Sequence, residues 1–410
     1  MNKLKVLEPL TLPNGAVIKN RFFKSAMGEA MANRKNQPNR LHVNLYHLWA
    51  EGGAGIVMTG NVMVDHNALG EPGNVVVEDE RDINILKQWA KAGTANNTQL
   101  WMQINHPGKQ SPRTLSKEPV APSAVPIAGG FRGAFNDPRA LTTNEVKDLV
   151  NRFITTAKIA KKAGFTGVQI HGAHGYLVNQ FLSPYDNRRI DQYGGTLENR
   201  MRFLVEIYQG MRKTLGADFP IGLKLNSTDF KEGGFTEEDS IEVVKKMATL
   251  GIDLIEISGG SYENPKMSLG TGKGSDEVFF LDYATKLKSL VDVPIVVTGG
   301  FRSKESMEEA LISQKTTMVG IARPFALVPD IPNQIMEGSY ETVKTQRLTT
   351  GFKSLDKRLG PLIGISYYEQ QMQLIAKGKK TKRQQKNAWS PLFHTLMLHG
   401  ISALSPRRSK

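Results

Sequence analysis

Eight short apolar runs recur along the chain, and segments of helix length separate them. The segment 142–162, for example, carries Val146, Leu149 and Phe153 at helical intervals. Strands that alternate with helices pair in parallel through right-handed crossovers. An open dinucleotide-binding sheet would normally show GxGxxG after its first strand, and FFKSAMGEAM does not. We therefore predict an α/β fold, a closed TIM (β/α)8 barrel. The runs are residues 22–27, 55–62, 99–105, 167–171, 221–226, 254–259, 294–300 and 316–322.

Residue types that begin and end helices mark the same boundaries. Thr143 and Thr236 stand at positions expected for helix N-caps, and Gly164, Gly216 and Gly251 stand where helices should end. The long segments are therefore predicted to be helices that cover the barrel.

Two stretches lie outside this repeat. Near the N-terminus, extended runs on either side of the Pro-Asn-Gly triplet at 13–15 predict a β-hairpin, which could close the bottom of the barrel. Near the C-terminus, Tyr367, Met372 and Ile375 are spaced for one face of a helix. The predicted parts are a barrel in residues 1–345, a helical extension in 346–377 that packs on the barrel or a neighbouring subunit, and a basic linker with an apolar tail in 378–410.

Composition narrows the classes of partner. The formal net charge is +14, but residues 370–410 hold nine Lys and Arg and no acidic residue, which leaves +5 for the rest. A basic tail is usually solvated or contacts a partner, so we do not expect nucleic-acid binding. Cys is absent, which excludes disulfides and iron–sulfur clusters and is compatible with a reducing compartment. No secretory signal or membrane span is expected, and a soluble, cytoplasmic protein is predicted.

The tail combines apolar and basic residues. Trp389, Leu392, Phe393 and Met397 lie in an apolar stretch with positive charge on both sides. A helix on an anionic membrane surface would show this pattern. So would an arm that clasps a second subunit, which is the interpretation we favour.

Each predicted strand ends in a polar or charged residue. In a TIM barrel the chemistry lies at the carboxyl ends of the strands, which meet at one face. Eight polar strand ends are more than a structural barrel requires. They are Ser25, Thr59 with Asn61, Gln103 with Asn105, His171, Lys224 with Asn226, Ser258, Thr298 and Arg323.

Glycines follow the last two strands and indicate a phosphate site. Gly299 and Gly300 follow the seventh strand, and the eighth ends in Gly320, Ala322 and Arg323. Glycine lets backbone N–H groups approach a phosphate, and arginine adds a charged fork. The alternative is that these glycines only turn the chain. We favour phosphate because both loops carry the feature.

Gln103 and Lys224 fall on the third and fifth strands. An amide and a cation facing each other suit the pyrimidine edge of a flavin, where a cation near N1 stabilises the reduced ring. Lys224 has two other interpretations, a Schiff-base lysine and a buried ion-pair partner. Spacing alone leaves these open.

His171, His174 and Tyr176 follow the fourth strand. A metal site would need a third ligand, and no Cys or HExxH is present. A structural pair of histidines is a second alternative. We favour two N–H donors that hold a carbonyl oxygen, with Tyr176 as proton donor.

Several long motifs resemble those of the Old Yellow Enzyme family, the FMN-dependent NAD(P)H:flavin oxidoreductases and ene-reductases. The longest is HGAHGYLVNQFLSPYDNRRIDQYGGTLENRMRF at residues 171–203, and others are KNRFFKSAM, MQINHPGKQ, GLKLNSTDF, VTGGFR and VGIARPFALVPDIP. They occur in the family's order and spacing over roughly residues 5–340. The resemblance implies a TIM barrel that binds FMN non-covalently.

The resemblance also implies a role for each matching residue. His171 and His174 would hold the substrate oxygen, and Tyr176 would donate a proton. The cofactor contacts would be Ser25, Ala26, Met27, Gly28 and Gly60 along the flavin, Gln103 and Lys224 at its pyrimidine edge, Ser258 nearby, and Gly299, Gly300, Ala322 and Arg323 at the phosphate.

Two half-reactions follow from the resemblance. NAD(P)H would reduce FMN by hydride transfer to N5 and leave. An electron-poor alkene would then take hydride at its β carbon and a proton from Tyr176 at its α carbon. Reduction of quinones, nitro compounds or free flavin at the same site is an alternative, and a Schiff-base lyase that uses Lys224 is a more remote one. No metal is expected.

Three departures from the family pattern matter. Gly28 stands where many relatives carry a Cys or Thr that touches the flavin, and Lys224 stands where many carry Arg, so one ammonium replaces a planar fork. Larger relatives hold a cysteine-ligated iron–sulfur cluster, which this chain without Cys cannot form. The prediction is therefore a form built on a single barrel.

Overall fold

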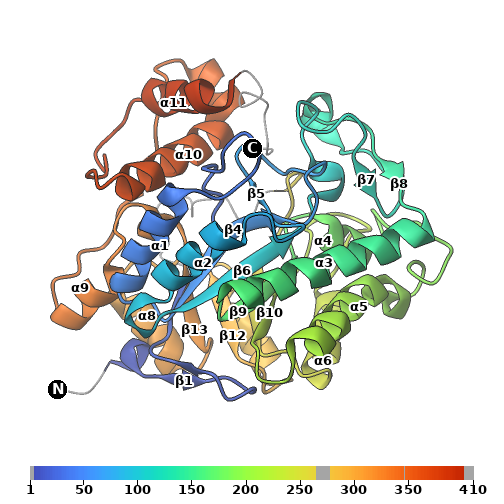
Figure 1. Ribbon diagram of the computed structural model, residues 1–410, viewed down its shortest axis with the longest axis horizontal. Coiled ribbons are helices and arrows are strands. Elements are labelled where there is room, and N and C mark those ends of the chain that lie inside the picture. The colour runs from blue at the N-terminus through green and yellow to red at the C-terminus, as the bar shows by residue number, and fades with distance from the viewer. Residues whose placement is uncertain (1–3, 265–277, 346, 401–410) are drawn as a thin grey trace.

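Eight parallel strands close into a barrel in the computed structural model, which describes residues 4–264, 278–345 and 347–400 (Figure 1). The last strand pairs with the first, and every pairing around the barrel is parallel. The predicted TIM barrel is confirmed, and each of the eight apolar runs overlaps one strand. In order around the barrel these are β3 (Phe22–Lys24), β4 (Ile56–Met63), β6 (Gln99–Asn105), β9 (Gly167–Gly172), β10 (Ile221–Asn226), β11 (Leu254–Ser258), β12 (Ile295–Thr298) and β13 (Met318–Ile321).

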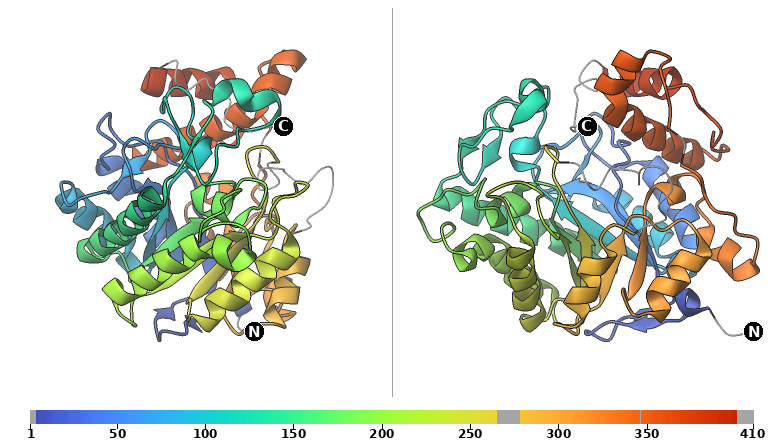
Figure 2. Two further views of the ribbon diagram at one scale, coloured as in Figure 1. Left: turned by 90° about the vertical axis from the view of Figure 1, so that its right-hand side faces the viewer. Right: turned by 180° about the vertical axis from the view of Figure 1, so that it is seen from behind.

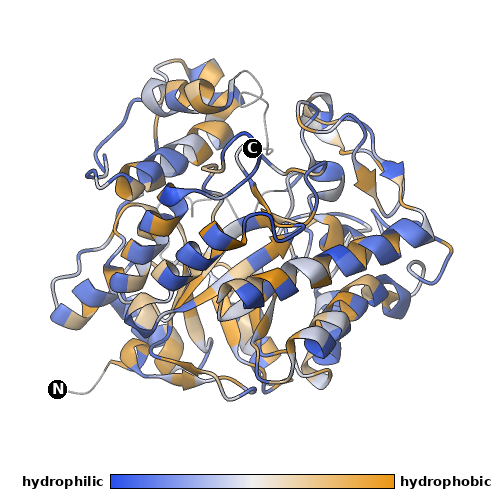
Figure 3. Cartoon of the chain, in the orientation of Figure 1, coloured by the Kyte–Doolittle hydropathy of each residue, from blue (hydrophilic) through white to orange (hydrophobic). Residues whose placement is uncertain are grey.

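Helices surround the strands and turn their apolar sides inward (Figure 3). The strands are apolar because one face meets the helices and the other meets the barrel axis. The longer covering helices are α1 (Arg40–Glu51), α2 (Ile83–Gly93), α3 (Thr143–Ala163), α5 (Leu197–Leu215), α6 (Glu237–Thr249), α7 (Leu281–Lys288) and α8 (Lys304–Ile312), and shorter ones are α4 (Leu177–Leu182) and α9 (Ile331–Glu337).

Helix caps agree with the sequence except at one position. Thr236 caps α6, and Gly164 ends α3 with a positive φ. The N-cap of α3 is Thr142, whose hydroxyl oxygen accepts a hydrogen bond from the Glu145 N–H while the Glu145 carboxylate accepts one from the Thr142 N–H. The predicted cap at Thr143 is therefore wrong by one residue, because this reciprocal capping box requires Glu three positions after the cap.

The predicted N-terminal hairpin closes the lower end of the barrel (Figure 1). Its strands β1 (Leu10–Thr11) and β2 (Val17–Ile18) pair antiparallel. Leu12 and Ile18 pack in one buried cluster with Trp101 and other inward-facing side chains of the strands. Trp101 fills the axis so closely that a Cβ at Gly167 would lie 2.6 Å from its indole ring. Packing therefore fills this end and leaves the other for chemistry.

Two excursions lie on the side of the carboxyl strand ends (Figures 1 and 2). One follows β6 and contains the short parallel strands β7 (Val120–Ala121) and β8 (Arg139–Ala140). The other is the C-terminal pair α10 (Lys353–Ala376) and α11 (Trp389–His399). The α10 helix packs on α1, where Asn44 Nδ2 donates to the Ala376 carbonyl oxygen at 3.0 Å. Among the helices described, none has both the length and the apolar character needed to cross a bilayer.

The tail begins as a helix that packs on its own chain. Leu392 of α11 is buried against α10, whereas Phe393 and Met397 are exposed. Trp389 is half-exposed, and its Nε1 donates to the Thr350 carbonyl oxygen at 3.0 Å. The exposed apolar side chains of α11 could contact a second subunit, and this role of the tail stays a prediction. Residues 401–410 of the predicted tail lie outside the described residues.

Candidate functional site

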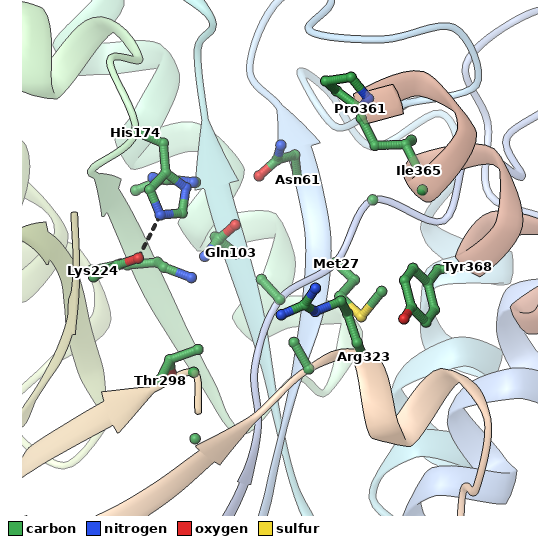
Figure 4. Close-up of a pocket in the computed structure, with 18 of the residues that line it drawn as sticks. Met27, Asn61, Gln103, His174, Lys224, Thr298, Arg323, Pro361, Ile365 and Tyr368 are labelled. Atoms are coloured by element: carbon green, nitrogen blue, oxygen red, sulfur yellow. Dashed lines mark hydrogen bonds between the residues drawn. The ribbon is translucent and has the colours of Figure 1, made fainter. Parts of the chain in front are cut away.

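A cavity of about 330 Å³ opens at the carboxyl ends of the strands (Figure 4). The barrel strands and the loops that follow them form most of its wall, and α10 contributes the rest. Of the predicted site residues, those that line this cavity are Ala26, Met27, Gly28, Gln103, His171, His174, Tyr176, Lys224, Ser258, Gly299, Gly300, Ala322 and Arg323.

Ser25 and Gly60 stand behind the wall instead. Ser25 is fully buried, and its hydroxyl lies 2.8 Å from Thr298 Oγ1. The Gly60 N–H donates to Glu29 Oε1 at 2.9 Å, and a Cβ at Gly60 would lie 2.5 Å from the Met27 carbonyl oxygen. Both residues therefore support the segment that carries Met27.

A buried polar network crosses the barrel beneath the cavity, centred on Glu256. Its Oε1 accepts from Thr298 Oγ1 at 2.6 Å and lies 3.1 Å from Lys224 Nζ. Its Oε2 accepts from Gln169 Nε2 at 2.9 Å, and Gln169 Oε1 accepts from Gln103 Nε2 at 2.7 Å. A buried carboxylate is stable only when it is paired and hydrogen-bonded, and this one is. The structure thus contains the buried ion pair that was one of the interpretations of Lys224.

The same network leaves one polar side-chain atom of Gln103 available for a ligand. Its Nε2 is used by Gln169, and its Oε1 is buried with no hydrogen-bond partner in the described part of the chain. An orphaned buried acceptor costs about 1–3 kcal/mol, so a ligand with an N–H at this position would relieve the cost. Beside it, Lys224 supplies a cation. The donor set fits the pyrimidine edge of a flavin, with Gln103 acting as acceptor.

Glycine and arginine form the other end of the cavity wall. Gly299 and Gly300 have φ values of +104° and +95°, a conformation that side chains rarely adopt. Nothing lies within 4 Å of the position that a Cβ of Gly299 would take. Arg323 stands two residues after the end of β13 and lines the same cavity. Their arrangement would fit a phosphate, and the phosphate site stays a prediction.

His171 and His174 are held in defined orientations near Tyr176. The ring centroid of His171 lies 4.8 Å from that of Tyr176 and 5.1 Å from that of His174. His171 Nδ1 accepts from the Ala173 N–H at 3.3 Å, so a neutral ring carries its proton on Nε2 and can donate from there. His174 Nε2 lies 2.7 Å from Ser258 Oγ, which assigns Ser258 to the orientation of this ring.

The turn after β9 holds His174 in an uncommon backbone conformation, with φ of +63°. Such a conformation persists when neighbours fix it. The His174 N–H donates to Asn226 Oδ1 at 3.0 Å, and Gln110 Nε2 donates to the His174 carbonyl oxygen at 2.9 Å. The last residue of β10 and the segment after β6 thus fix the backbone that carries this imidazole.

The cavity also contains residues for which the sequence predicted no individual role. Tyr262 lies in the loop after β11, and its hydroxyl is 2.8 Å from that of Tyr176. Asn61, a polar strand end with no predicted role, has its Nδ2 3.4 Å from the Tyr176 hydroxyl. Further members of the wall are Glu71 and Arg302 in loops and Pro361, Ile365 and Tyr368 of α10. The only signal for Tyr262 was its place shortly after a predicted strand.

The metal interpretation of the two histidines gains no support. Among the described residues, the one grouping of three potential ligands within 4.8 Å is Asp65, His66 and Glu78, which contains neither His171 nor His174. His66 Nδ1 lies 2.9 Å from Glu78, and Arg81 also pairs with that carboxylate.

Known proteins are similar to this chain in both sequence and fold. The profile of the NADH:flavin oxidoreductase / NADH oxidase family matches residues 5–342. NADH-dependent flavin oxidoreductase iliE of Hypocrea jecorina (strain QM6a) is 37% identical, over 82% of this chain and 90% of its own length. The iliE protein of Neonectria sp. (strain DH2) is 38% identical over 81% of this chain, which spans 47% of that protein.

Two further relatives are longer than this chain. Cinnamate reductase of Clostridium sporogenes (strain ATCC 7955 / DSM 767 / NBRC 16411 / NCIMB 8053 / NCTC 8594 / PA 3679) is 34% identical over 80% of this chain and 52% of its own length. The structure of 2-naphthoyl-CoA reductase with 2-naphthoyl-CoA aligns with a TM-score of 0.75 and 27% identity, over 82% of this chain and 52% of that one.

Motifs, barrel and profile agree along the same residues. The chain therefore belongs to the NADH:flavin oxidoreductase / NADH oxidase family, the Old Yellow Enzyme group that its sequence motifs predicted.

Proposed function

We propose that this protein is an FMN-dependent NAD(P)H oxidoreductase that reduces electron-poor alkenes such as enones. The observation that carries the proposal is the grouping of His171, His174 and Tyr176 on one cavity wall with Gln103 and Lys224 beneath. Cinnamate, the substrate in the name of one relative, is itself an alkene conjugated to a carboxylate. The site in this chain has the groups that such chemistry requires.

The cofactor would be held at two ends. Gln103 Oε1 would accept from a ring N–H, and the Lys224 ammonium, fixed 3.1 Å from Glu256, would face the same edge. Gly299, Gly300 and Arg323 would hold the phosphate. FMN, when bound, supplies the hydride that it takes from NAD(P)H.

The remaining groups act on the substrate. His171 and His174 would donate to its carbonyl oxygen and stabilise the charge that develops there. Tyr176 would protonate the α carbon, a role that typically contributes about 10²–10⁴-fold. Because Tyr176 is almost completely buried, the proton comes from a positioned donor and not from bulk water.

Separate half-reactions test this assignment. We expect NADH or NADPH to reduce bound FMN equally fast in the wild type and in Tyr176→Phe, because proton donation to carbon is not part of that step. Reoxidation by an enone should slow by about 10²–10⁴-fold in the variant. Tyr185→Phe is the matched control, since Tyr185 does not line the cavity.

Each outcome points to one interpretation. Equal slowing of both half-reactions contradicts Tyr176 as proton donor. Wild-type reoxidation by quinones and nitro compounds but none by enones would favour the alternative reductase function at the same site. Borohydride trapping of a substrate on Lys224 would favour the lyase, which needs this lysine away from Glu256.

A further inference from the structure

We propose that Tyr262 is a positioning residue for the proton donor: its hydroxyl stabilises the negative charge left on Tyr176 after proton transfer. The inference rests on the proposed function, in which Tyr176 protonates the substrate. It adds a second phenol, outside the His171, His174 and Tyr176 set, to the same step.

The two phenols form one buried unit. Their hydroxyl oxygens lie 2.8 Å apart, and their ring centroids are 5.7 Å apart with planes at 70°. Only 3% of Tyr176 and 4% of Tyr262 are exposed. Asn61 Nδ2 lies 3.4 Å from the Tyr176 hydroxyl on the same cavity wall.

The hydrogen bond between the two phenols becomes stronger when Tyr176 loses its proton. When the O–H bond of Tyr176 breaks and a C–H bond forms on the substrate, a phenolate is left in a site with little water. Hydrogen bonds to an ionised oxygen are about twice as strong as those between neutral groups. A donor that strengthens its contact only as charge develops lowers the barrier. Solvent returns a proton to Tyr176 once the product has left the cavity.

The surroundings fix Tyr262 for this contact. Its backbone N–H donates to Gln110 Oε1 at 3.2 Å, and Gln110 Nε2 donates to the His174 carbonyl oxygen at 2.9 Å. One amide side chain therefore ties the Tyr262 loop to the turn that carries the substrate-binding imidazole. Ile127 and Phe135 of the excursion after β6 cover the phenol pair in an apolar cluster.

Tyr262→Phe removes one hydroxyl from this unit. We expect the enone half-reaction to slow by about 10²-fold, the value of one lost oxyanion donor, while reduction of FMN by NADH stays unchanged. The alkaline limb of the enone rate should move to higher pH, because the Tyr176 phenolate is less stabilised. Tyr176→Phe combined with Tyr262→Phe should be no slower than Tyr176→Phe alone.

The controls separate this inference from the proposed function. If Tyr176→Phe slows enone reduction but Tyr262→Phe matches the Tyr185→Phe control in rate and pH profile, Tyr262 has no such role and the proton donor stands. If Tyr176→Phe itself has no effect on enone reduction, Tyr176 is not the proton donor, and the inference about Tyr262 falls with that assignment. If Tyr262→Phe loses FMN, the variant Tyr262→His, which keeps a hydrogen-bond donor, tests the inference instead. An FMN content restored to the wild-type level without a restored rate of enone reduction contradicts the inference.

Discussion

At the scale of single residues, position 28 shows how a missing side chain changes its surroundings. A Cβ at Gly28 would lie 1.9 Å from Glu71 Oε1, so the Glu71 carboxylate occupies the space that a side chain would take. Glu71 lines the cavity next to Met27 and Gly28, and Asn74 Nδ2 donates to its Oε1 at 3.3 Å. The Glu71 carboxylate thus occupies the space in which the Cys or Thr side chain of many family members is expected.

Glu71→Gln should therefore raise the reduction potential of bound FMN. A nearby negative charge opposes the addition of electrons, and removing it should shift the potential upward by roughly 20–40 mV, about 1–2 kcal/mol for a two-electron couple. Spectroelectrochemical titration measures the shift. Glu242→Gln, an exposed carboxylate on α6 paired with Lys245, serves as control. An unchanged or lower potential would show that Glu71 does not act on the cofactor.

Site residues could be predicted where barrel geometry brings them together. Carboxyl strand ends share one face, so the order of the strands was enough to predict that Gln103, His171 and Lys224 lie together, and all three line the cavity. Tyr262 and Glu71 could not be found this way, because loop conformation determines where they point. The donor and acceptor roles of Gln103 also depend on Gln169, a contact that sequence spacing does not show.

At the scale of elements, α10 completes the cavity. Pro361, Ile365 and Tyr368 lie across the pocket from His174 and Lys224 (Figure 4). The sequence indicated the helix through Tyr367, Met372 and Ile375, which are buried. Pro361, Ile365 and Tyr368 also recur at helical spacing, with Gly360 and Gly364 beside them, but spacing alone does not show that this face of the helix meets a cavity.

Two substitutions at Gly364 separate helix stability from cavity shape. Nothing lies within 4 Å of the position of a Cβ at Gly364, so Gly364→Ala should stabilise the protein by about 0.5–1 kcal/mol and leave FMN affinity unchanged. Gly364→Leu should extend into the cavity and weaken FMN binding by about tenfold or more. Thermal unfolding and fluorescence titration with FMN measure the two effects. Equal affinity in both variants would mean that α10 does not bound the cofactor site.

At the scale of the whole molecule, the barrel could be predicted because its strands are buried on both faces and must be apolar whatever the function. The hairpin that closes the lower end of the barrel could be predicted from its turn sequence. Leu12 and Ile18 of this segment pack with Trp101. The excursion after β6 could not be predicted, since β7 and β8 are two residues each and carry no periodic pattern. Local errors such as Thr143 for Thr142 leave the topology unchanged.

Stability of the whole fold should depend on pH through two buried histidines. Burial lowers the pKa of His42 to about 3 and that of His106 to about 4. His42 Nδ1 accepts from the Asn39 N–H at 3.2 Å, and His106 Nδ1 accepts from the Gly108 N–H at 3.0 Å. In the unfolded chain each has a pKa of about 6.5, so below that pH the unfolded state binds more protons. Their contribution is complete above about pH 6.5 and is lost as the pH falls toward 3.

His42→Gln should reduce this acid sensitivity. Each buried histidine adds a slope of up to about 1.4 kcal/mol per pH unit to the free energy of unfolding between about pH 6 and pH 4, and the variant lacks one of the two. Urea unfolding at a series of pH values measures the slope. His47→Gln is the matched control, because His47 lies on the same helix with its side chain exposed. If His42→Gln and His47→Gln keep the same slope as the wild type, protonation of His42 does not limit stability in acid.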